Sequence, residues 1–167
     1  MSEKLQNLEK LFKDEIGIYK NLAILETSKK EAILRSNAKL LESFTNQSSK
    51  QMNDLQVLEV ERMKLVDEVI PNEKKSTDKV PSLSIFLDSL DKISLTKFKP
   101  LATDLKEVVS GLKEKISLNE QLLKSKLEIF SMSIDALKNA AEPTTSELYG
   151  DQGKSKVRTN IMLNMKA

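Results

Sequence analysis

The sequence predicts an all-α protein, an elongated antiparallel bundle of long helices that ends in a flexible C-terminal tail. The first observation is composition: charged residues make up 31% of the 167 residues and aromatic residues only 4%, which is typical of long helices rather than sheets. The second is that apolar residues recur at steps of three and four, the helical period. The third is that four glycines and four prolines leave few places where a helix must end.

The first predicted element is a long helical region over residues 1–70. One apolar stripe runs through its first half, which predicts a single long amphipathic helix there. The stripe consists of Leu5, Leu8, Phe12, Ile16, Tyr19, Leu22, Ile33, Leu40 and Phe44. Polar residues 26–31 interrupt it, so the helix either emerges into solvent at that point or bends. Residues 45–50 are also polar and form either a turn or a weak point in a continuous helix.

The stripe returns after residue 50. Its members there are Leu55, Leu58, Leu65, Val66 and Val69. Arg62 lies among them, three residues after Glu59. Opposite charges at this spacing are neighbours on a helix surface, so we expect these two side chains to form a pair within one helix.

A linker and a short helix come next. Residues 71–81 are polar, lack periodicity and are bounded by two prolines, which predicts an exposed linker. The second helical region, residues 82–142, begins with a short helix that has Ser82 as its candidate N-cap. Four apolar side chains of this helix are expected to point inward: Leu83, Phe86, Leu87 and Leu90.

The last long helix is predicted to start near Pro100 and to reach Ala141. Its stripe is Leu105, Val109, Leu112, Ile116, Asn119, Leu123, Leu127, Phe130, Ile134, Leu137 and Ala141. A helix of this length cannot bury such a stripe alone, so it must pack lengthwise against the first region. Asn119 is the clearly polar member of the stripe and is expected to fix the register of the packed helices.

Residues 143–167 are predicted to form a flexible, partner-binding tail. They hold two of the four glycines, and their four basic and two acidic residues account for the net charge of +2. Tyr149 is a candidate docking anchor because aromatic side chains dominate many interfaces. Near the terminus, apolar residues at helical spacing predict a segment that becomes amphipathic on binding. They are Val157, Ile161, Met162, Leu163 and Met165.

Several classes of function are excluded by residues that the chain lacks. It contains no histidine and no cysteine, so Ser-His-Asp and Cys-His nucleophile systems and the common zinc sites cannot be built. We predict that the protein is not an enzyme and needs no cofactor. The near balance of charge argues against nucleic acid as a partner, and no apolar run is long enough for stable membrane insertion. The charged N-terminus and the absence of cysteine predict a cytoplasmic protein.

Four short motifs run along the chain. The first region contains Glu15, Tyr19, Leu22, Ile33, Asn37 and Leu40, and its end contains Leu58, Glu59 and Arg62. The last helix contains Asn119, Leu122 and Leu123, and the tail contains Leu148, Tyr149, Gly150 and Gly153. Together these motifs resemble the pattern of the FlgN-type flagellar export chaperones over nearly the whole chain. The tail motif is the most specific of them.

The resemblance implies a cytoplasmic helical chaperone that binds the two hook-filament junction proteins before their export through the flagellar type III apparatus. It would place client binding on the end of the last helix and the tail, including Val157, Ile161, Met162, Leu163 and Met165. It would place docking at an export gate component on Tyr149, with Gly150 and Gly153 beside it. The chain departs from the family pattern in its longer, methionine-bearing terminus.

Two other interpretations remain open at this stage. The same stripes could drive self-association of a structural or adaptor coiled-coil protein. Removal of residues 143–167 discriminates, because a chaperone should lose its client whereas a scaffold should keep its oligomeric state and partners. The third interpretation is a carboxylate-bridged metalloenzyme, which metal analysis of purified protein would test; we expect no bound metal.

Overall fold

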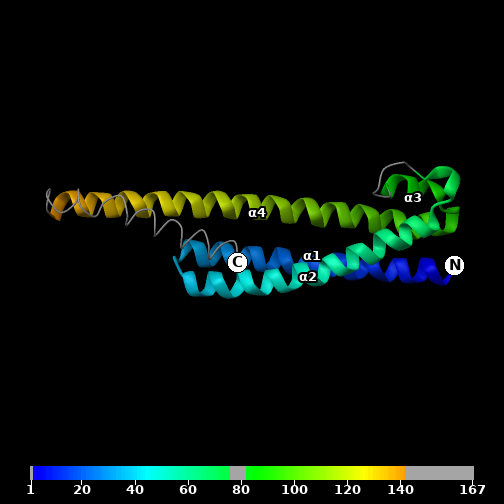
Figure 1. The fold of residues 1–167 in the computed structure, drawn as a ribbon, viewed down its shortest axis with the longest axis horizontal. Helices are drawn as coiled ribbons and strands as arrows, with labels where there is room; N and C mark the ends of the chain where they lie inside the picture. Colours follow the sequence, from blue (N-terminus) through cyan, green and yellow to red (C-terminus); the bar gives the residue numbers. More distant parts are fainter. Residues whose placement is uncertain (1, 76–81, 142–167) are drawn as a thin grey trace. The chain divides into compact units, whose positions relative to one another are not determined.

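The described residues are all helical or lie in the connections between helices. The computed structural model describes residues 2–75 and 82–141, and this part of the chain contains no strand. Its α-helices are α1 (Glu3–Leu34), α2 (Ala38–Val69), α3 (Leu83–Ser89) and α4 (Lys92–Ala141), with a 3₁₀ helix, η1, at Asn72–Lys74 (Figure 1). The predicted all-α class is therefore confirmed.

The chain divides into two compact units. Unit 1 comprises Met1–Ile24 and Ser48–Glu114, and unit 2 comprises Leu25–Gln47 and Lys115–Ala167. In unit 1 the contacts Lys4–Glu68 and Arg62–Glu15 pair early residues of α1 with late residues of α2, so these two helices run antiparallel. In unit 2 the contacts of Lys115 with Thr27 and of Lys126 with Leu34 show that the second half of α4 runs parallel to the end of α1.

Three phenylalanines from three helices form the centre of unit 1. The ring centroids of Phe12 and Phe98 are 5.9 Å apart, those of Phe86 and Phe98 are 5.3 Å apart, and both pairs meet edge to face. All three side chains are fully buried. Burial of an aromatic side chain of this size contributes roughly 1.5–3 kcal/mol. The surrounding core is completed by Leu8, Ile16, Val66, Ile70 and Leu105.

The prediction of one helix running through residue 44 is wrong, because α1 ends at Leu34. Ser36 adopts a positive φ of 54°, and the N–H groups of Ser36 and Asn37 donate to the carbonyls of Ile33 and Ala32 at 3.0 and 2.9 Å. This is the Schellman arrangement that terminates helices. The side chain of Asn37 then caps α2, since its Oδ1 accepts the Leu40 N–H at 3.1 Å.

The two polar stretches that were left open are both helical. Residues 26–31 stay within α1 and residues 45–50 stay within α2, so neither forms a turn. Glu26 and Ser48, one from each stretch, are buried. The polar residues therefore do not mark a point at which the chain emerges into solvent.

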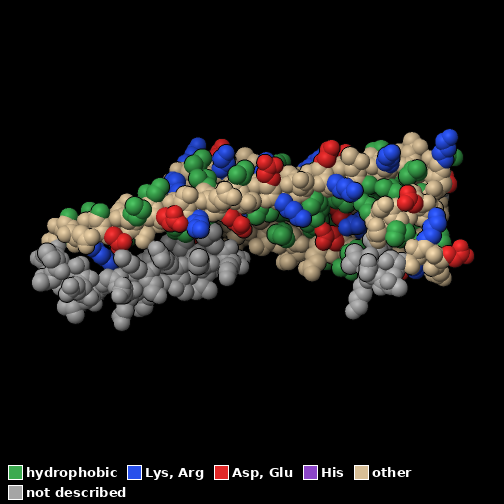
Figure 2. Space-filling view, turned by 90° about the horizontal axis from the view of Figure 1, so that it is seen from above, with side chains coloured by type: hydrophobic (Ala, Val, Ile, Leu, Met, Phe, Trp, Pro, Cys, Tyr) green, Lys and Arg blue, Asp and Glu red, His purple; other side chains and the backbone are tan. Residues whose placement is uncertain are grey.

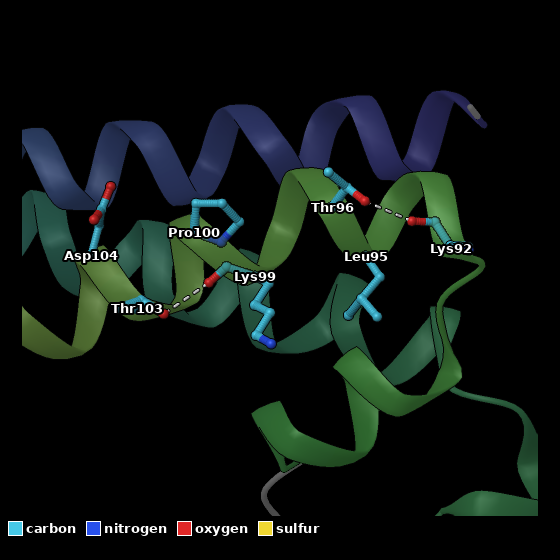
Figure 3. A pocket seen from close by; sticks show the side chains of 7 residues that line it. All are labelled: Lys92, Leu95, Thr96, Lys99, Pro100, Thr103 and Asp104. Carbon is cyan, nitrogen blue, oxygen red and sulfur yellow. Dashed lines mark hydrogen bonds between the residues drawn. The ribbon is translucent and has the colours of Figure 1, made fainter.

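The last helix begins before Pro100 rather than near it. Asp91 caps α4, because its Oδ2 accepts the N–H groups of Ile93 and Ser94 at 3.2 and 3.4 Å. Pro100 lies inside α4 (Figure 3), where its missing N–H removes one helical hydrogen bond. Burial of Phe98 and Leu105 on either side of it holds this stretch helical despite that cost.

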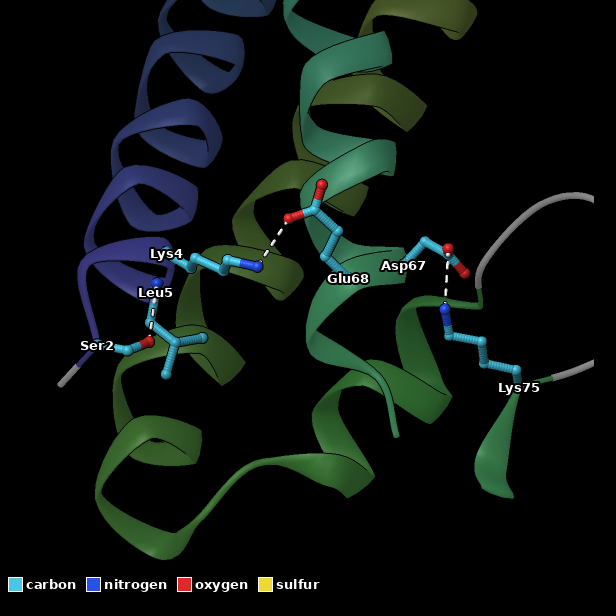
Figure 4. Close-up of polar contacts among 6 residues, drawn as sticks. All are labelled: Ser2, Lys4, Leu5, Asp67, Glu68 and Lys75. Carbon is cyan, nitrogen blue, oxygen red and sulfur yellow. Dashed lines mark hydrogen bonds and ion pairs between the residues drawn. The ribbon is translucent and has the colours of Figure 1, made fainter. Parts of the chain in front are cut away.

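The connection between α2 and α4 is described for residues 71–75, and its division from the helical regions stays a prediction. Residues 71–75 are exposed, and Lys75 forms an ion pair with Asp67 at 3.1 Å (Figure 4). The remaining predicted linker residues, 76–81, lie outside the described residues. Of the four predicted inward residues, Phe86 is buried and the other three pack against the core, with Leu90 as the C-cap of α3. Ser82 occupies the N-cap position but its side chain makes no capping hydrogen bond.

Candidate functional site

A partly buried polar cluster joins α1 to α2 in unit 1. Arg62 Nε donates to Glu15 Oε1 at 2.8 Å, and the hydroxyl of Tyr19 donates to Glu59 Oε1 at 2.6 Å. The predicted pair between Glu59 and Arg62 is therefore replaced by contacts between helices. Packing of α1 against α2 gives each of these side chains a partner that sequence spacing cannot indicate.

Electrostatics in this cluster follow from burial. Glu15 is fully buried, and this desolvation raises its pKa although the Arg62 guanidinium opposes the shift. Desolvation and the neighbouring Glu59 carboxylate also hold the pKa of Tyr19 well above its usual range. Tyr19 therefore remains a protonated donor at neutral pH. Arg62 also lies 5.6 Å from the centroid of the Phe12 ring, a cation–π distance.

Asn119 lies in a second polar cluster, in unit 2. Its Nδ2 donates to the backbone oxygen of Glu26 at 2.7 Å and to Glu26 Oε2 at 2.8 Å. The other carboxylate oxygen of Glu26 pairs with Lys29 at 2.8 Å. Both Asn119 and Glu26 are buried, so this contact connects α4 to α1 away from water. A role of Asn119 in fixing register stays a prediction.

Lys126 marks the last contact that we describe between α4 and the turn after α1. Its Nζ donates to the Leu34 carbonyl at 2.8 Å and to Ser36 Oγ at 3.0 Å. A cation at the C-terminus of a helix also compensates its dipole. The α4 helix continues to Ala141, and its final segment, residues 127–141, would span about 22 Å at 1.5 Å per residue. We call this segment the α4 end.

The side chains in the apolar stripe of α4 become more exposed toward the C-terminal end of the helix. Leu112 and Asn119 are 6% and 7% exposed, whereas Phe130 and Leu137 are 52% and 71% exposed. The expectation that the whole stripe packs against the first region is therefore wrong for the α4 end. Figure 2 shows hydrophobic side chains at the surface of this end of the helix. Such an exposed apolar row is typical of an interaction site.

The described residues provide no evident catalytic or metal centre. Among residues 2–75 and 82–141 there is no group of three or more acidic side chains placed to hold a metal ion. The same part of the chain contains no helix long and apolar enough to cross a bilayer. A surface pocket beside Pro100 is lined by Lys92, Leu95, Thr96, Lys99, Thr103 and Asp104 (Figure 3). The hydroxyls of its two threonines donate to backbone carbonyls of α4.

Comparison with known protein families identifies the chain. The model of the FlgN protein family matches residues 1–156. The chain belongs to the FlgN family of flagellar export chaperones. No curated protein and no solved structure matches it. FlgN is a chaperone family rather than an enzyme family, and its members bind flagellar substrates.

Most of the predicted site of this FlgN protein lies outside the described residues. This applies to all three candidate docking residues, Tyr149, Gly150 and Gly153, and to all five candidate client-binding residues, Val157, Ile161, Met162, Leu163 and Met165. The five client-binding candidates also follow the last residue of the family match, residue 156. Both sets stay predictions. Asn119 is the predicted site residue that the structure describes.

Several motif residues of this FlgN protein meet in space. Glu15 and Tyr19 of the first motif contact Arg62 and Glu59 of the second, while Asn37 caps α2. Sequence reasoning missed Glu26 as the partner of Asn119, and it missed Ile129 and Met132 as exposed side chains. We call the predicted apolar stripe of α4, which begins at Leu105, the main stripe. Ile129 and Met132 lie outside it, and this position was the signal that could have identified them as exposed.

Proposed function

We propose that this chain is a cytoplasmic export chaperone that binds hook-filament junction proteins, shields their terminal helices and delivers them to the flagellar type III export gate. Membership of the FlgN family carries the proposal. The arrangement of α4 supports it, because the helix keeps exposed apolar side chains close to the point where the tail begins.

The α4 end is suited to cover an amphipathic helix. Phe130 and Leu137 are seven residues apart and so lie on one face, two helical turns from each other. Fully covering side chains of this kind contributes roughly 1.5–3 kcal/mol each. Subunits that assemble through apolar helices need such cover before assembly, since exposed apolar surface promotes aggregation. A helix-in-groove contact with a client would supply it.

The tail supplies the remaining parts of the proposed mechanism. Val157, Ile161, Met162, Leu163 and Met165 are proposed to extend the client contact beyond α4. Tyr149, with Gly150 and Gly153, is proposed to dock at the export gate. Separation of the two groups along the tail would let one chain hold a client and contact the gate together.

The proposal is tested by size-exclusion chromatography with light scattering. The protein is mixed with each hook-filament junction protein, and the full chain is compared with one that ends at Glu142. We expect a defined complex with the full chain and loss of that complex on truncation. Formation of a complex with neither protein contradicts the proposed clients.

Substitutions in α4 locate the client contact further. We expect Phe130→Gln with Leu137→Gln to weaken client binding, because glutamine keeps the helix while removing apolar surface. Asn139→Gln, an exposed position about half a turn around the helix axis from Leu137, is the matched control and should bind normally. Loss of a complex on truncation, but not with this double substitution, would restrict the site to the tail. Oligomers that persist without any client would favour the self-associating scaffold instead.

A further inference from the structure

A second apolar row follows α4 on a different face. Leu118, Ile129 and Met132 are 57%, 64% and 70% exposed. At about 100° per residue they fall within a sector of roughly 60° around the helix axis. Phe130 and Leu137 lie outside this sector, about a quarter turn away. We call the row of Leu118, Ile129 and Met132 the outer stripe.

The outer stripe cannot be covered by the element that covers the main stripe. A helix with apolar side chains over more than half of its circumference is usually buried on several sides. Leu118, Ile129 and Met132 all stay more than half exposed, so the described elements leave most of the outer stripe uncovered. A separate element can therefore occupy it.

We propose that the chain's own C-terminal segment, residues 157–165, packs on the outer stripe when no client is bound. The length of the intervening chain permits this contact. Residues 142–156 can span up to about 50 Å when extended. The distance back along α4 from Ala141 to Leu118 is about 35 Å at 1.5 Å per residue. The segment can therefore reach any part of the outer stripe.

The chemistry of the two surfaces is complementary. Val157, Ile161 and Met165 repeat every four residues, which places them on one side of a helical segment that can face the stripe. Residues 152–167 contain four basic and no acidic residues. Glu128 lies four residues before Met132, so its carboxylate is a neighbour of the stripe on the helix surface. Lys124 lies one turn before Glu128, and Lys138 lies nearly half a turn around the helix axis from the stripe.

Tethering makes even a weak contact sufficient. A short flexible linker gives an effective concentration on the order of 1 mM. A contact with a dissociation constant of about 1 mM would then be about half formed within one molecule. The contact is proposed for the protein alone and does not depend on the proposed function. If a client uses the same segment, however, that client must first displace it.

Paramagnetic relaxation tests the contact in the full chain without any client. The protein has no cysteine, so Ser125→Cys, an exposed position between Leu118 and Ile129, accepts a single nitroxide label. Methyl signals of Met162 and Met165 are observed with ¹³C-labelled methionine and assigned by single Met→Leu substitutions. We expect the label to reduce both signals about twofold or more, as a half-populated contact requires.

Two matched variants separate packing from mere nearness of the tether. Ile129→Gln with Met132→Gln removes the outer stripe and should restore both signals, whereas Phe130→Gln with Leu137→Gln should leave them reduced. All four positions are exposed, and circular dichroism checks that each variant remains helical. Equal signals in both variants would overturn the proposal. A reduction that also appears when labelled and observed molecules are mixed would assign the stripe to a second copy instead.

Discussion

Arg62 and Glu15 show how one buried charge pair joins two helices. Glu15 has no exposed side-chain surface, and the Arg62 side chain is 18% exposed. Within the described part of the chain Glu15 Oε2 has no hydrogen-bond partner, so the carboxylate depends on Arg62 for its compensation. Removal of one member of such a pair is more destabilising than removal of both, because it leaves a buried charge alone.

This dependence predicts the effect of substitutions at the pair. We expect Arg62→Met to lower the free energy of unfolding by about 3 kcal/mol, since Glu15 is left unpaired. The double variant Arg62→Met with Glu15→Leu should recover most of that loss. Urea denaturation monitored by circular dichroism measures both. A double variant that is no more stable than Arg62→Met would show that the charge of Glu15 is not the cause.

The raised pKa of Glu15 predicts a specific dependence of stability on pH. A carboxyl whose pKa is higher in the folded state than its unfolded value, 4.5, binds its proton more tightly when folded. Its contribution to stability is therefore fully present below the unfolded pKa and is lost as the pH rises through the folded pKa. Comparing the native chain with Glu15→Gln removes the contributions of the other carboxyl groups from the pH dependence of stability.

We expect the stability of the native chain relative to Glu15→Gln to fall as the pH rises above the unfolded pKa of 4.5 and through the higher folded pKa of Glu15. Urea titrations of both proteins across this range measure the difference. A relative stability that instead rises with pH would mean that Arg62 outweighs desolvation and lowers the pKa of Glu15.

At the scale of the element, the turn between α1 and α2 depends on two consecutive polar residues. Ser36 takes the left-handed position that glycine usually occupies, and Asn37 begins the next helix. Loss of an N-cap side chain typically costs about 1 kcal/mol. We therefore expect Asn37→Ala to lower the free energy of unfolding by about that amount in thermal or urea denaturation.

The same helix offers a control for this prediction. Asn46 is exposed in the interior of α2, where alanine is a better helix former than asparagine. Asn46→Ala should therefore leave stability unchanged or slightly increase it. Equal destabilisation by both substitutions would argue against the capping role of Asn37.

The helical faces could be predicted from the sequence, but two helix ends could not. Apolar spacing identified much of the buried side of the helices, as Phe12, Phe86 and Leu105 show, but the predicted stripes also included Leu40 and Phe130, which are exposed. The end of α1 was missed because Ser36 carries no glycine signal. Pro100 was interpreted as a helix start, although packing of its neighbours overrides the preference of proline. Local preference thus fails where tertiary contacts decide.

The candidate site also contains residues that the sequence could predict and residues that it could not. Asn119 was identified because a polar residue in an apolar stripe stands out in one helix. Its partner Glu26 was not, because only the packing of α4 against α1 brings them together. The exposure of Phe130 depends on where α1 ends, so the error at Ser36 hid the uncovered part of α4 as well.

At the scale of the whole molecule, buried side chains are distributed unevenly along the described part of the chain. The fully buried apolar core lies in unit 1, around the three phenylalanines. Unit 2 has few buried side chains among the described residues, and none of them lies beyond Asn119 in the sequence. The free energy of local opening is low where few apolar contacts are buried, so segments of that kind open without global unfolding.

This distribution predicts a gradient of hydrogen exchange along α4. Amides near Phe98 and Leu105 should exchange only through global unfolding, whereas those of the α4 end should exchange faster by several orders of magnitude. Mass spectrometry on peptides from native protein measures the gradient.

Truncation at Glu142 should leave protection near Phe98 unchanged, because the core around Phe98 is built from residues that precede Glu142. Uniform protection along α4 would contradict this prediction. Binding of a client should raise protection at the α4 end first, so this segment would report directly on the proposed site.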